Sequence, residues 1–265
     1  MYSKFQLAKK YIHYYLTASN GKGHGVHSPF VFEFITKILN DKKQYECYAT
    51  IEKQRQLLLQ NTDIIEVEDF GAGSAVMKSN KRVIKHIAAS SLKSKKFAQL
   101  LYRMVQYYQP ATILELGTSL GITSSYLAKG NKQGNVFTCE GSSTIASIAQ
   151  KNFDQLHIKN IHLTQGDFAK TLQPLLNEID KVNLAFIDGN HRKDPTLEYF
   201  SKLLNHSTSS TIVVFDDIHW SEEMEAAWHQ IQQHACVTLT IDLFFIGLVF
   251  INADFKEKQH FTIRF

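Results

Sequence analysis

Three carboxylates follow apolar segments that have the composition of buried strands. Asp188 comes directly after the apolar segment 182–187, and Asp216 and Asp217 come directly after the apolar segment 211–215. Carboxylate oxygens are the ligands that hard divalent cations prefer, and a bound cation lowers the pKa of a substrate hydroxyl while it fixes the position of that hydroxyl. The spacing therefore predicts a metal site, with Mg²⁺ as the first expectation and Mn²⁺ or Ca²⁺ as alternatives.

A glycine-containing turn, Gly117-Thr-Ser-Leu-Gly121, follows the apolar segment 113–116 and precedes a predicted helix. Glycines allow a tight turn and a close approach of the backbone to a ligand, and the first amides of the next helix favour an anionic group. The G-x-G-x-x-G spacing of dinucleotide sites is absent from this turn. We therefore expect a cofactor of another kind here.

The same turn also matches the G-x-S-x-G nucleophile elbow of α/β-hydrolases, with Ser119 as the nucleophile. In hydrolases the elbow follows several strands, whereas this turn ends the first predicted strand of the sheet. Glu115, two residues before the first glycine, also has no role in an elbow. A serine esterase stays as an alternative from another class of enzyme.

Residues Glu115 to Gly121 resemble the E-x-G-x-x-x-G signature of class I S-adenosylmethionine-dependent methyltransferases. Two later positions match in order. The resemblance implies that Glu140 accepts hydrogen bonds from the ribose hydroxyls and that Gly166-Asp167 borders the adenine, while Thr123 reaches the methionine carboxylate. S-adenosylmethionine is thus the implied cofactor, and its implied ligands are Glu115, Gly117, Thr118, Ser119, Gly121, Thr123, Glu140, Gly166, Asp167 and Asp188.

Each of these matches also has a purely structural interpretation. Glu140 can be a surface carboxylate at a strand end, Asp167 can cap the helix that follows it, and Thr123 can be a first-turn helix residue. Asp188 can belong to a turn, and Asp216-Asp217 to a helix-capping loop. We favour the cofactor and metal interpretation because the matches occur together and in the same order as in the family.

The resemblance narrows to the metal-dependent O-methyltransferases of the catechol, caffeoyl-coenzyme A, macrolide-sugar and aminocoumarin-sugar types. These enzymes carry one Asp after the fourth strand and an Asp-Asp or Asp-Asn pair after the fifth, which Asp188 and Asp216-Asp217 match. Two histidines compete as the general base that accepts the hydroxyl proton. His191 lies three residues after Asp188 and His219 two residues after Asp217, and the sequence does not choose between them.

From residue 111 onward, short apolar segments alternate with amphipathic segments, a pattern typical of βαβ units and a parallel sheet. We predict strands near 112–116, 135–139, 160–164, 182–187 and 211–215, and helices near 122–130, 143–153, 168–177, 194–205 and 221–234. Segments 237–241 and 244–251 are too close for a parallel crossover and predict an antiparallel hairpin at the sheet edge. The expected fold class is α/β, a Rossmann-like doubly wound sheet, for which the resemblance implies the order 3-2-1-4-5-7-6 with strand 7 antiparallel.

The first hundred residues are predicted to be mainly helical, with helices at 4–18, from 29 onward, and at 46–60, 79–89 and 95–108. The first of these places an apolar stripe on one face, made by Phe5, Ala8, Ile12, Tyr15 and Leu16. The turn 69–74 is interpreted as a mobile turn or lid. We expect a helical N-terminal cap or lid at 1–104 and a methyltransferase domain at 105–265.

Composition sets the broad class. The chain has 265 residues, of which 44% are hydrophobic and 20% charged, with a formal net charge of +4, as in ordinary globular proteins. Its three cysteines predict neither a disulfide framework nor a zinc cluster. No apolar stretch of about 18 residues and no signal sequence is evident, so we expect a cytoplasmic protein without a membrane partner.

Two other functions remain open at this stage beside O-methylation of a small hydroxylated acceptor. Residues 70–114 contain no Asp or Glu, and the basic stretch 78–103 is rich in lysine and arginine, which suits methylation of RNA such as tRNA. A noncatalytic cofactor-binding module is the other. The N-terminal helices either pack within one chain or exchange across a homodimer, and the sequence leaves both open.

Overall fold

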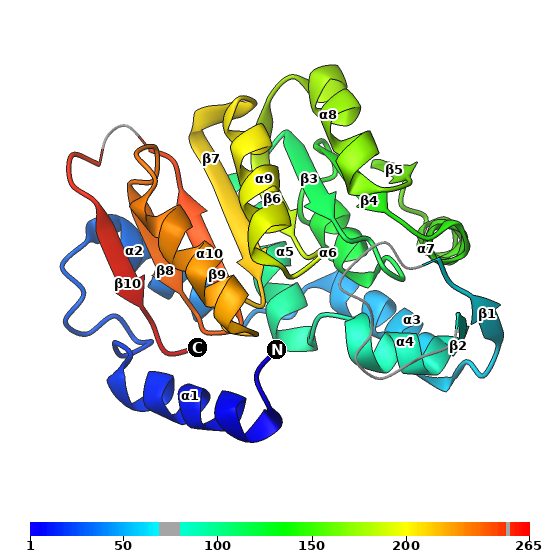
Figure 1. Ribbon diagram of the computed structural model, residues 1–265, viewed down its shortest axis with the longest axis horizontal. Helices are drawn as coiled ribbons and strands as arrows, with labels where there is room; N and C mark the ends of the chain where they lie inside the picture. The colour runs from blue at the N-terminus through cyan, green and yellow to red at the C-terminus, as the bar shows by residue number, and fades with distance from the viewer. Residues whose placement is uncertain (69–79, 253–254) are drawn as a thin grey trace. The chain divides into compact units, whose positions relative to one another are not determined.

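The computed structural model describes residues 1–68, 80–252 and 255–265 (Figure 1). The chain divides into two compact units. One unit comprises residues 1–41 and 180–265, and the other comprises residues 42–179. The turn predicted at 69–74 lies outside the described residues. The division at residue 104 stays a prediction.

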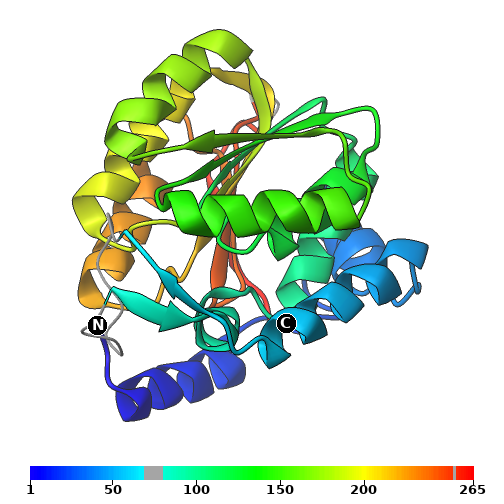
Figure 2. The same ribbon diagram turned by 90° about the vertical axis from the view of Figure 1, so that its right-hand side faces the viewer.

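In the unit 42–179, three parallel strands form the order β3-β4-β5: β3 (Thr112–Leu116), β4 (Asn135–Glu140) and β5 (Ile161–Gln165). The helices that follow them are α6 (Ile122–Gly130), α7 (Ser143–Gln155) and α8 (Phe168–Ile179). Figure 2 shows α7 against strands β4 and β5. This confirms the 3-2-1 part of the expected order and places each helix within two residues of its predicted ends.

Ahead of these strands lie α3 (Glu46–Gln60), α4 (Ile84–Ser91) and α5 (Lys95–Tyr108). The predicted helix at 79–89 is wrong in its first half, because residues 81–83 form strand β2 (Lys81–Val83), which pairs antiparallel with β1 (Ile64–Glu66). Three-residue strands carry too little alternation to be recognised in a sequence. Helix α5 buries Leu100, Leu101 and Met104 completely, as its apolar spacing predicts.

In the other unit, β6 (Val182–Ile187) and β7 (Ser207–Asp216) are parallel. Strand β9 (Ile246–Phe250) pairs antiparallel with β7, and β8 (Leu239–Asp242) pairs antiparallel with β9. The order β6-β7-β9-β8 confirms the 4-5-7-6 part and the hairpin. The hairpin is not at the edge, however, because β10 (Gln259–Thr262) pairs parallel with β8.

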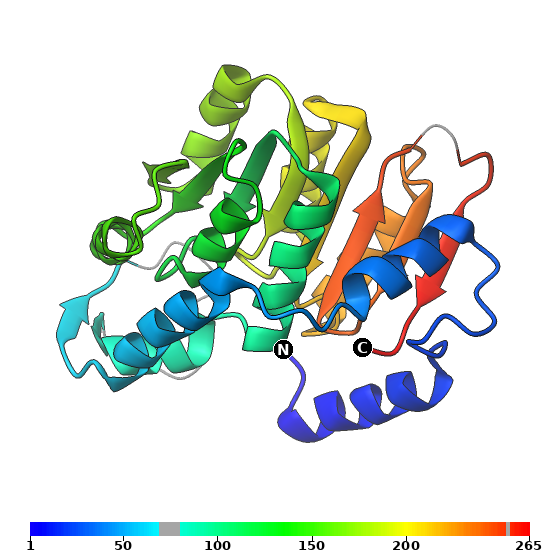
Figure 3. The ribbon, with the colours of Figure 1, turned by 180° about the vertical axis from the view of Figure 1, so that it is seen from behind.

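Helices cover both faces of this hairpin. Helix α10 (Glu222–Gln233) follows α9 (Lys193–Leu204) and lies on one face (Figure 1). Helix α2 (Pro29–Glu33) and the π-helical turn η1 (Phe34–Leu39) lie on the other face (Figure 3). The rings of Phe30 and Phe34 there stand edge-on to Phe250. Strands covered on both faces are apolar throughout, and β9 is buried at every position.

Helix α1 (Lys4–Thr17) forms as predicted, with Ser3 and Gln6 as a capping box at its start. Its predicted apolar stripe, however, is not the face that packs. Phe5 is 80% exposed and Leu16 is 73% exposed, whereas Tyr14 on the other face is 5% exposed. Among the described residues, no helix is both long and apolar enough to cross a membrane.

Close packing between β9 and α10 supports the strand that carries Asp216. Gly247 pairs with Phe215 of β7, and a Cβ added at Gly247 would lie 2.6 Å from the indole of Trp228. Because Gly247 has no side chain, the indole of Trp228 packs directly against the backbone of β9. A methyl group here would force the indole or the strand to move.

We predict that Gly247→Ala lowers the free energy of unfolding by about 1–3 kcal/mol, because overpacking of a filled core costs that much. Urea unfolding monitored by circular dichroism measures the change. In the matched double variant Gly247→Ala/Trp228→Leu the two effects should be less than additive, since the smaller side chain leaves space for the methyl group. Strict additivity would contradict the proposed contact.

Candidate cofactor and metal sites

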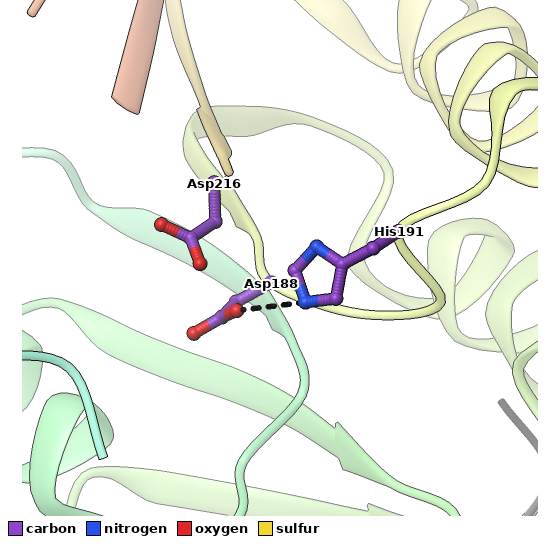
Figure 4. A group of neighbouring side chains, drawn as sticks. All are labelled: Asp188, His191 and Asp216. Carbon is purple, nitrogen blue, oxygen red and sulfur yellow. Dashed lines mark ion pairs between the residues drawn. The ribbon is translucent and has the colours of Figure 1, made fainter. Parts of the chain in front are cut away.

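The parallel register of β6 and β7 brings two of the predicted metal ligands together. Ile187 pairs with Phe215, so Asp188 and Asp216 follow neighbouring positions at the carboxyl ends of the two strands. One ligand atom each of Asp188, Asp216 and His191 lie within 4.8 Å of one another (Figure 4). Nε2 of His191 is 3.6 Å from Oδ1 of Asp188. Two carboxylates and an imidazole therefore converge at this edge.

The turn that carries His191 has an uncommon backbone conformation. Asn190 has a φ of 68° and His191 a φ of 23°, so two consecutive residues other than glycine have positive φ. Such conformations cost free energy and persist where the surroundings hold them, often at functional sites. The side-chain Nδ2 of Asn190 donates to the hydroxyl of Tyr199 at 3.2 Å, which helps to hold this turn.

Asp217 is placed differently from Asp216. Its φ is 53°, its N–H donates to the carbonyl of Phe245 at 2.7 Å, and its carbonyl accepts from the N–H of Trp220. Among the described residues, the cluster of ligand atoms comprises Asp188, His191 and Asp216 and does not include Asp217. The structure thus brings together two of the three predicted metal ligands and adds an imidazole.

The donor set fits a divalent cation. Ligands on opposite sides of an octahedral Mg²⁺ lie about 4.2 Å apart, so atoms within 4.8 Å of one another need only small rotations to share one ion. Two oxygens and one nitrogen also suit Mn²⁺ and other first-row metals, which accept imidazole more readily than Mg²⁺ does. Asp216 is 2% exposed, and a carboxylate so deeply buried is stabilised by positive charge.

His219, the second candidate base, is held on both ring nitrogens. Nδ1 lies 2.9 Å from Oε1 of Glu225, and Nε2 lies 2.8 Å from Oδ2 of Asp242, while the ring stacks on Phe244. Burial alone would lower the pKa of His219, but the hydrogen bonds and charges of the two carboxylates outweigh burial and raise that pKa. An imidazolium that donates to two carboxylates has no lone pair for a substrate proton.

In the unit 42–179, Glu115 lies beneath the glycine-containing turn rather than at its surface. It is completely buried, and its Oε2 accepts hydrogen bonds from the hydroxyls of Ser124 and Thr138. Thr138 in turn shares a 2.6 Å hydrogen bond with Thr118. Burial raises the pKa of Glu115 to about 7, although the two hydroxyl donors oppose that shift. Glu115 thus connects the turn to strand β4.

Glu140 is fixed at the end of β4 by backbone amides. The N–H of Ser119 donates to its Oε2 at 2.9 Å, and the N–H of Ser142 donates to its Oε1 at 3.0 Å. Each carboxylate oxygen has a second lone pair, which can accept a hydrogen bond from a ribose hydroxyl. Gly121 has a φ of 79°, and a Cβ there would lie 2.5 Å from the ring of Phe153, so only glycine fits this turn.

The remaining predicted cofactor residues occupy the ends of β3 and β5. Gly117 begins the turn after β3, and Gly166 follows β5, where its N–H donates to the carbonyl of Glu140. Oδ1 of Asp167 accepts from the N–H of Ala169, as expected of a helix cap. Thr123 is a buried residue of the first turn of α6. Their contacts with a cofactor stay predictions.

Ser119 does not have the surroundings of a hydrolase nucleophile in the part of the chain that the structure describes. Its φ of 47° is strained, as in an elbow, but its hydroxyl shares a 2.8 Å hydrogen bond with the hydroxyl of Ser91. Activation of a serine requires an imidazole or another base at that distance. The geometry does not favour the esterase interpretation.

Sequence reasoning did not find the residues that support these sites. Ser124 and Thr138 hold Glu115, while Glu225 and Asp242 hold His219. Thr138 gave a weak signal, since a polar residue inside an apolar strand needs a partner. Asp242 and Glu225 gave none, because no pattern in the sequence indicates that these carboxylates bind His219, which is 23 residues from Asp242 and 6 from Glu225.

Comparisons with known proteins agree with this fold. The family described as "Methyltransferase domain" matches residues 114–218. Catechol O-methyltransferase of Niastella koreensis is 33% identical over 126 residues, which make up 46% of this chain and 55% of that protein. The tRNA (guanine-N(7)-)-methyltransferase of Mycoplasma mobile is 36% identical over 77 residues, 29% of this chain and 38% of that protein. The chain thus spans about half or less of these relatives.

A solved O-methyltransferase from Bacillus cereus, in complex with S-adenosylhomocysteine, has the same fold. It aligns with a TM-score of 0.56 and 20% identity over 83% of this chain and 97% of that chain. Residues 114–218 thus match a methyltransferase domain, and the strand order within each unit is that of a Rossmann-like methyltransferase fold.

The bonds of His219 predict a pH-dependent stability. A raised folded-state pKa gives a stabilisation that is complete below the unfolded value of 6.5 and is lost as the pH rises through the folded-state pKa. We expect the free energy of unfolding to contain a component that decreases over this range and disappears in His219→Gln. The matched control is His86→Gln, which replaces an exposed histidine outside this network. An identical profile for wild type and His219→Gln would contradict the charged state assigned to His219.

Proposed function

We propose that the protein transfers the methyl group of S-adenosylmethionine to an oxygen of a small hydroxylated acceptor, with assistance from a divalent cation. The observation that carries this proposal is the convergence of Asp188, His191 and Asp216 at one edge of the strands. A noncatalytic cofactor-binding module would have no use for such a cluster. The match to a catechol O-methyltransferase supports an acceptor with two neighbouring oxygens.

Asp188 and Asp216 would hold the cation through their carboxylate oxygens. A bound divalent cation would supply Lewis acidity, which lowers the pKa of the acceptor hydroxyl and orients two acceptor oxygens. His191 would take the hydroxyl proton on Nε2. S-adenosylmethionine would supply the methyl group to the acceptor oxygen, with S-adenosylhomocysteine as the leaving group. We choose His191 over His219 because both ring nitrogens of His219 are already bound to carboxylates.

The cofactor would be held by the turn after β3 and by Glu140. Ribose hydroxyls donate to a carboxylate, and Glu140 is held by two amides with lone pairs to spare. Glu115 acts from below through Thr138 and Thr118, which fix the backbone of the turn. Rate acceleration then comes mainly from orientation and from electrostatics at the reacting oxygen.

Methylation of RNA is the second candidate, supported by the match to a tRNA methyltransferase. The basic stretch 78–103, which would bind RNA, is less exposed than the sequence suggests. Arg103 is 7% exposed, so this cation is enclosed by the packing around α5, whereas Lys96 is exposed. Lys78 lies outside the described residues. We therefore place the small acceptor first.

Methyl transfer itself is tested with radiolabelled S-adenosylmethionine, a panel of catechols and vicinal diols, and a transcribed tRNA pool. We expect label in a catechol or diol in the presence of Mg²⁺ or Mn²⁺, and its loss in Asp216→Asn. Label in tRNA alone, reduced by rising salt, would overturn the proposal in favour of the second candidate.

Direct titration with Mn²⁺, followed by the loss of the free-ion electron paramagnetic resonance signal, tests the metal site without an activity assay. Asp188→Asn and Asp216→Asn should each weaken Mn²⁺ binding by about tenfold or more, because each removes a charged ligand. Asp217→Asn is the matched control and should bind Mn²⁺ as the wild type does, since Asp217 lies outside the cluster. Equal losses in all three variants would contradict the proposed ligand set.

His191→Gln separates the role of a base from that of a metal ligand. If His191 is the base, Mn²⁺ affinity changes less than threefold, whereas kcat falls by about 10²–10⁴ because the acceptor of the hydroxyl proton is gone. A loss of Mn²⁺ affinity as large as that of Asp188→Asn would instead make His191 a ligand and overturn its assignment as the base.

A further inference from the structure

One face of helix α1 is fully occupied by contacts within its own unit. Tyr14 is buried and its hydroxyl donates to the carbonyl of Ile263. Nζ of Lys10 lies 3.0 Å from both carboxylate oxygens of Glu225, which also accepts from the hydroxyl of Tyr2 at 2.7 Å. This face of α1 therefore packs against its own unit. The helix could turn its other face inward only by breaking these hydrogen bonds and the ion pair.

The opposite face of α1 is apolar and exposed. The exposed fraction is 80% for Phe5, 58% for Ile12, 73% for Leu16 and 49% for Tyr15, and it is 67% for Met1 ahead of the helix. The stripe from Phe5 to Leu16 runs about 16 Å along the helix, at a rise of about 1.5 Å per residue. Scattered apolar residues on a surface are ordinary, but a continuous stripe on one helix face marks an interaction surface.

The charges beside this stripe are all positive. The first acidic residue of the chain is Glu33, and the first 32 residues contain four lysines, which account for the whole formal net charge of +4. At about 100° per residue, Lys9 borders the stripe on one side and Lys4 lies beside Tyr15 on the other. The guanidinium of Arg264 lies 4.5 Å from the ring of Tyr15 and adds a further cation at this edge.

The apolar stripe and the lysines beside it favour one of two binding partners, a second copy of α1 or an anionic lipid surface. A second copy of α1 would bring the lysines of both helices together, and neither helix carries a carboxylate to pair with them. An anionic lipid surface offers negative charge for the lysines and an apolar layer for the stripe. A helix with exposed aromatic and aliphatic residues flanked by lysines is the arrangement that lies in the plane of such a surface.

We propose that α1 is a peripheral membrane anchor that places its stripe of Phe5, Ile12, Tyr15 and Leu16 in the interface of an anionic bilayer. The absence of a spanning helix among the described residues does not bear on this mode of binding, because the helix lies parallel to the surface. The anchor is independent of the proposed methyl transfer and would hold the protein where acceptors that partition into membranes are concentrated.

Vesicle flotation tests the proposal on the full chain. Vesicles of phosphatidylcholine are compared with vesicles of an equimolar mixture of phosphatidylcholine and phosphatidylglycerol. We expect binding to the anionic vesicles, little binding to the neutral ones, and weaker binding as the salt concentration rises.

Two double variants separate the apolar and the electrostatic contributions. Phe5→Ser/Leu16→Ser should weaken binding to the anionic vesicles by about tenfold or more, because each side chain leaves water only in the bound state. Lys4→Gln/Lys9→Gln should weaken it by about 25-fold, since each lysine near an anionic surface contributes about fivefold. The matched controls Leu57→Ser/Ile64→Ser and Lys159→Gln/Lys181→Gln change exposed residues elsewhere and should bind as the wild type does.

Other outcomes overturn the proposal. Equal binding to both kinds of vesicle, equal losses in the controls, or no binding at all would each exclude an anionic membrane anchor. A dimer in solution that Phe5→Ser/Leu16→Ser dissociates, without vesicle binding, would assign the stripe to a second copy. Unchanged circular dichroism and urea unfolding of the variants show that the fold is intact.

Discussion

The parallel register of the strands determines which side chains can act together in this protein. Leu116 pairs with Cys139 and Glu140 with Gln165, so the glycine-containing turn, Glu140 and Gly166 share one edge of β3, β4 and β5. In the other unit, Ile187 pairs with Phe215, so Asp188 and Asp216 follow neighbouring positions at the carboxyl ends of β6 and β7. A shift of one residue would turn these side chains to the opposite faces of the strands and separate them. The chemistry proposed above therefore depends on the apolar contacts that set this register.

Buried polar groups then hold the ends of the strands in place. Glu115 is hydrogen-bonded beneath its turn to two hydroxyls, and His219, in the loop that follows β7, is held between Glu225 and Asp242. Groups of this kind cost free energy to bury and are favourable only when their partners are well placed. Both networks are next to the proposed sites but act on backbone geometry rather than on substrate. This explains why His219, which looked like a candidate base, is better understood as part of the support.

Much of this arrangement could be predicted from the sequence, because it depends on local patterns. The strands from β3 to β7 coincide with short segments that were predicted as strands. The turn between Gly117 and Gly121 is recognised by the spacing of its two glycines. Strands β1, β2 and β10 were not predicted, since three or four residues at an edge show no clear period. The outward stripe of α1 was also not foreseeable, because an amphipathic pattern does not say which face meets the fold. Whether Asp217 or His191 joins the cluster depends on positive backbone angles at Asn190, His191 and Asp217, which no sequence rule assigns to those residues.

Isothermal titration with S-adenosylhomocysteine tests the central claim most directly, because it needs no knowledge of the acceptor. The titration is run on the wild type, on Glu140→Ala, and on Asp154→Ala as a control that removes an exposed carboxylate from α7. We expect micromolar binding to the wild type and to the control, and a large loss of affinity in Glu140→Ala, where the acceptor of the ribose hydroxyls is gone. No binding to the folded wild type, or equal binding to all three proteins, would contradict the proposed cofactor site.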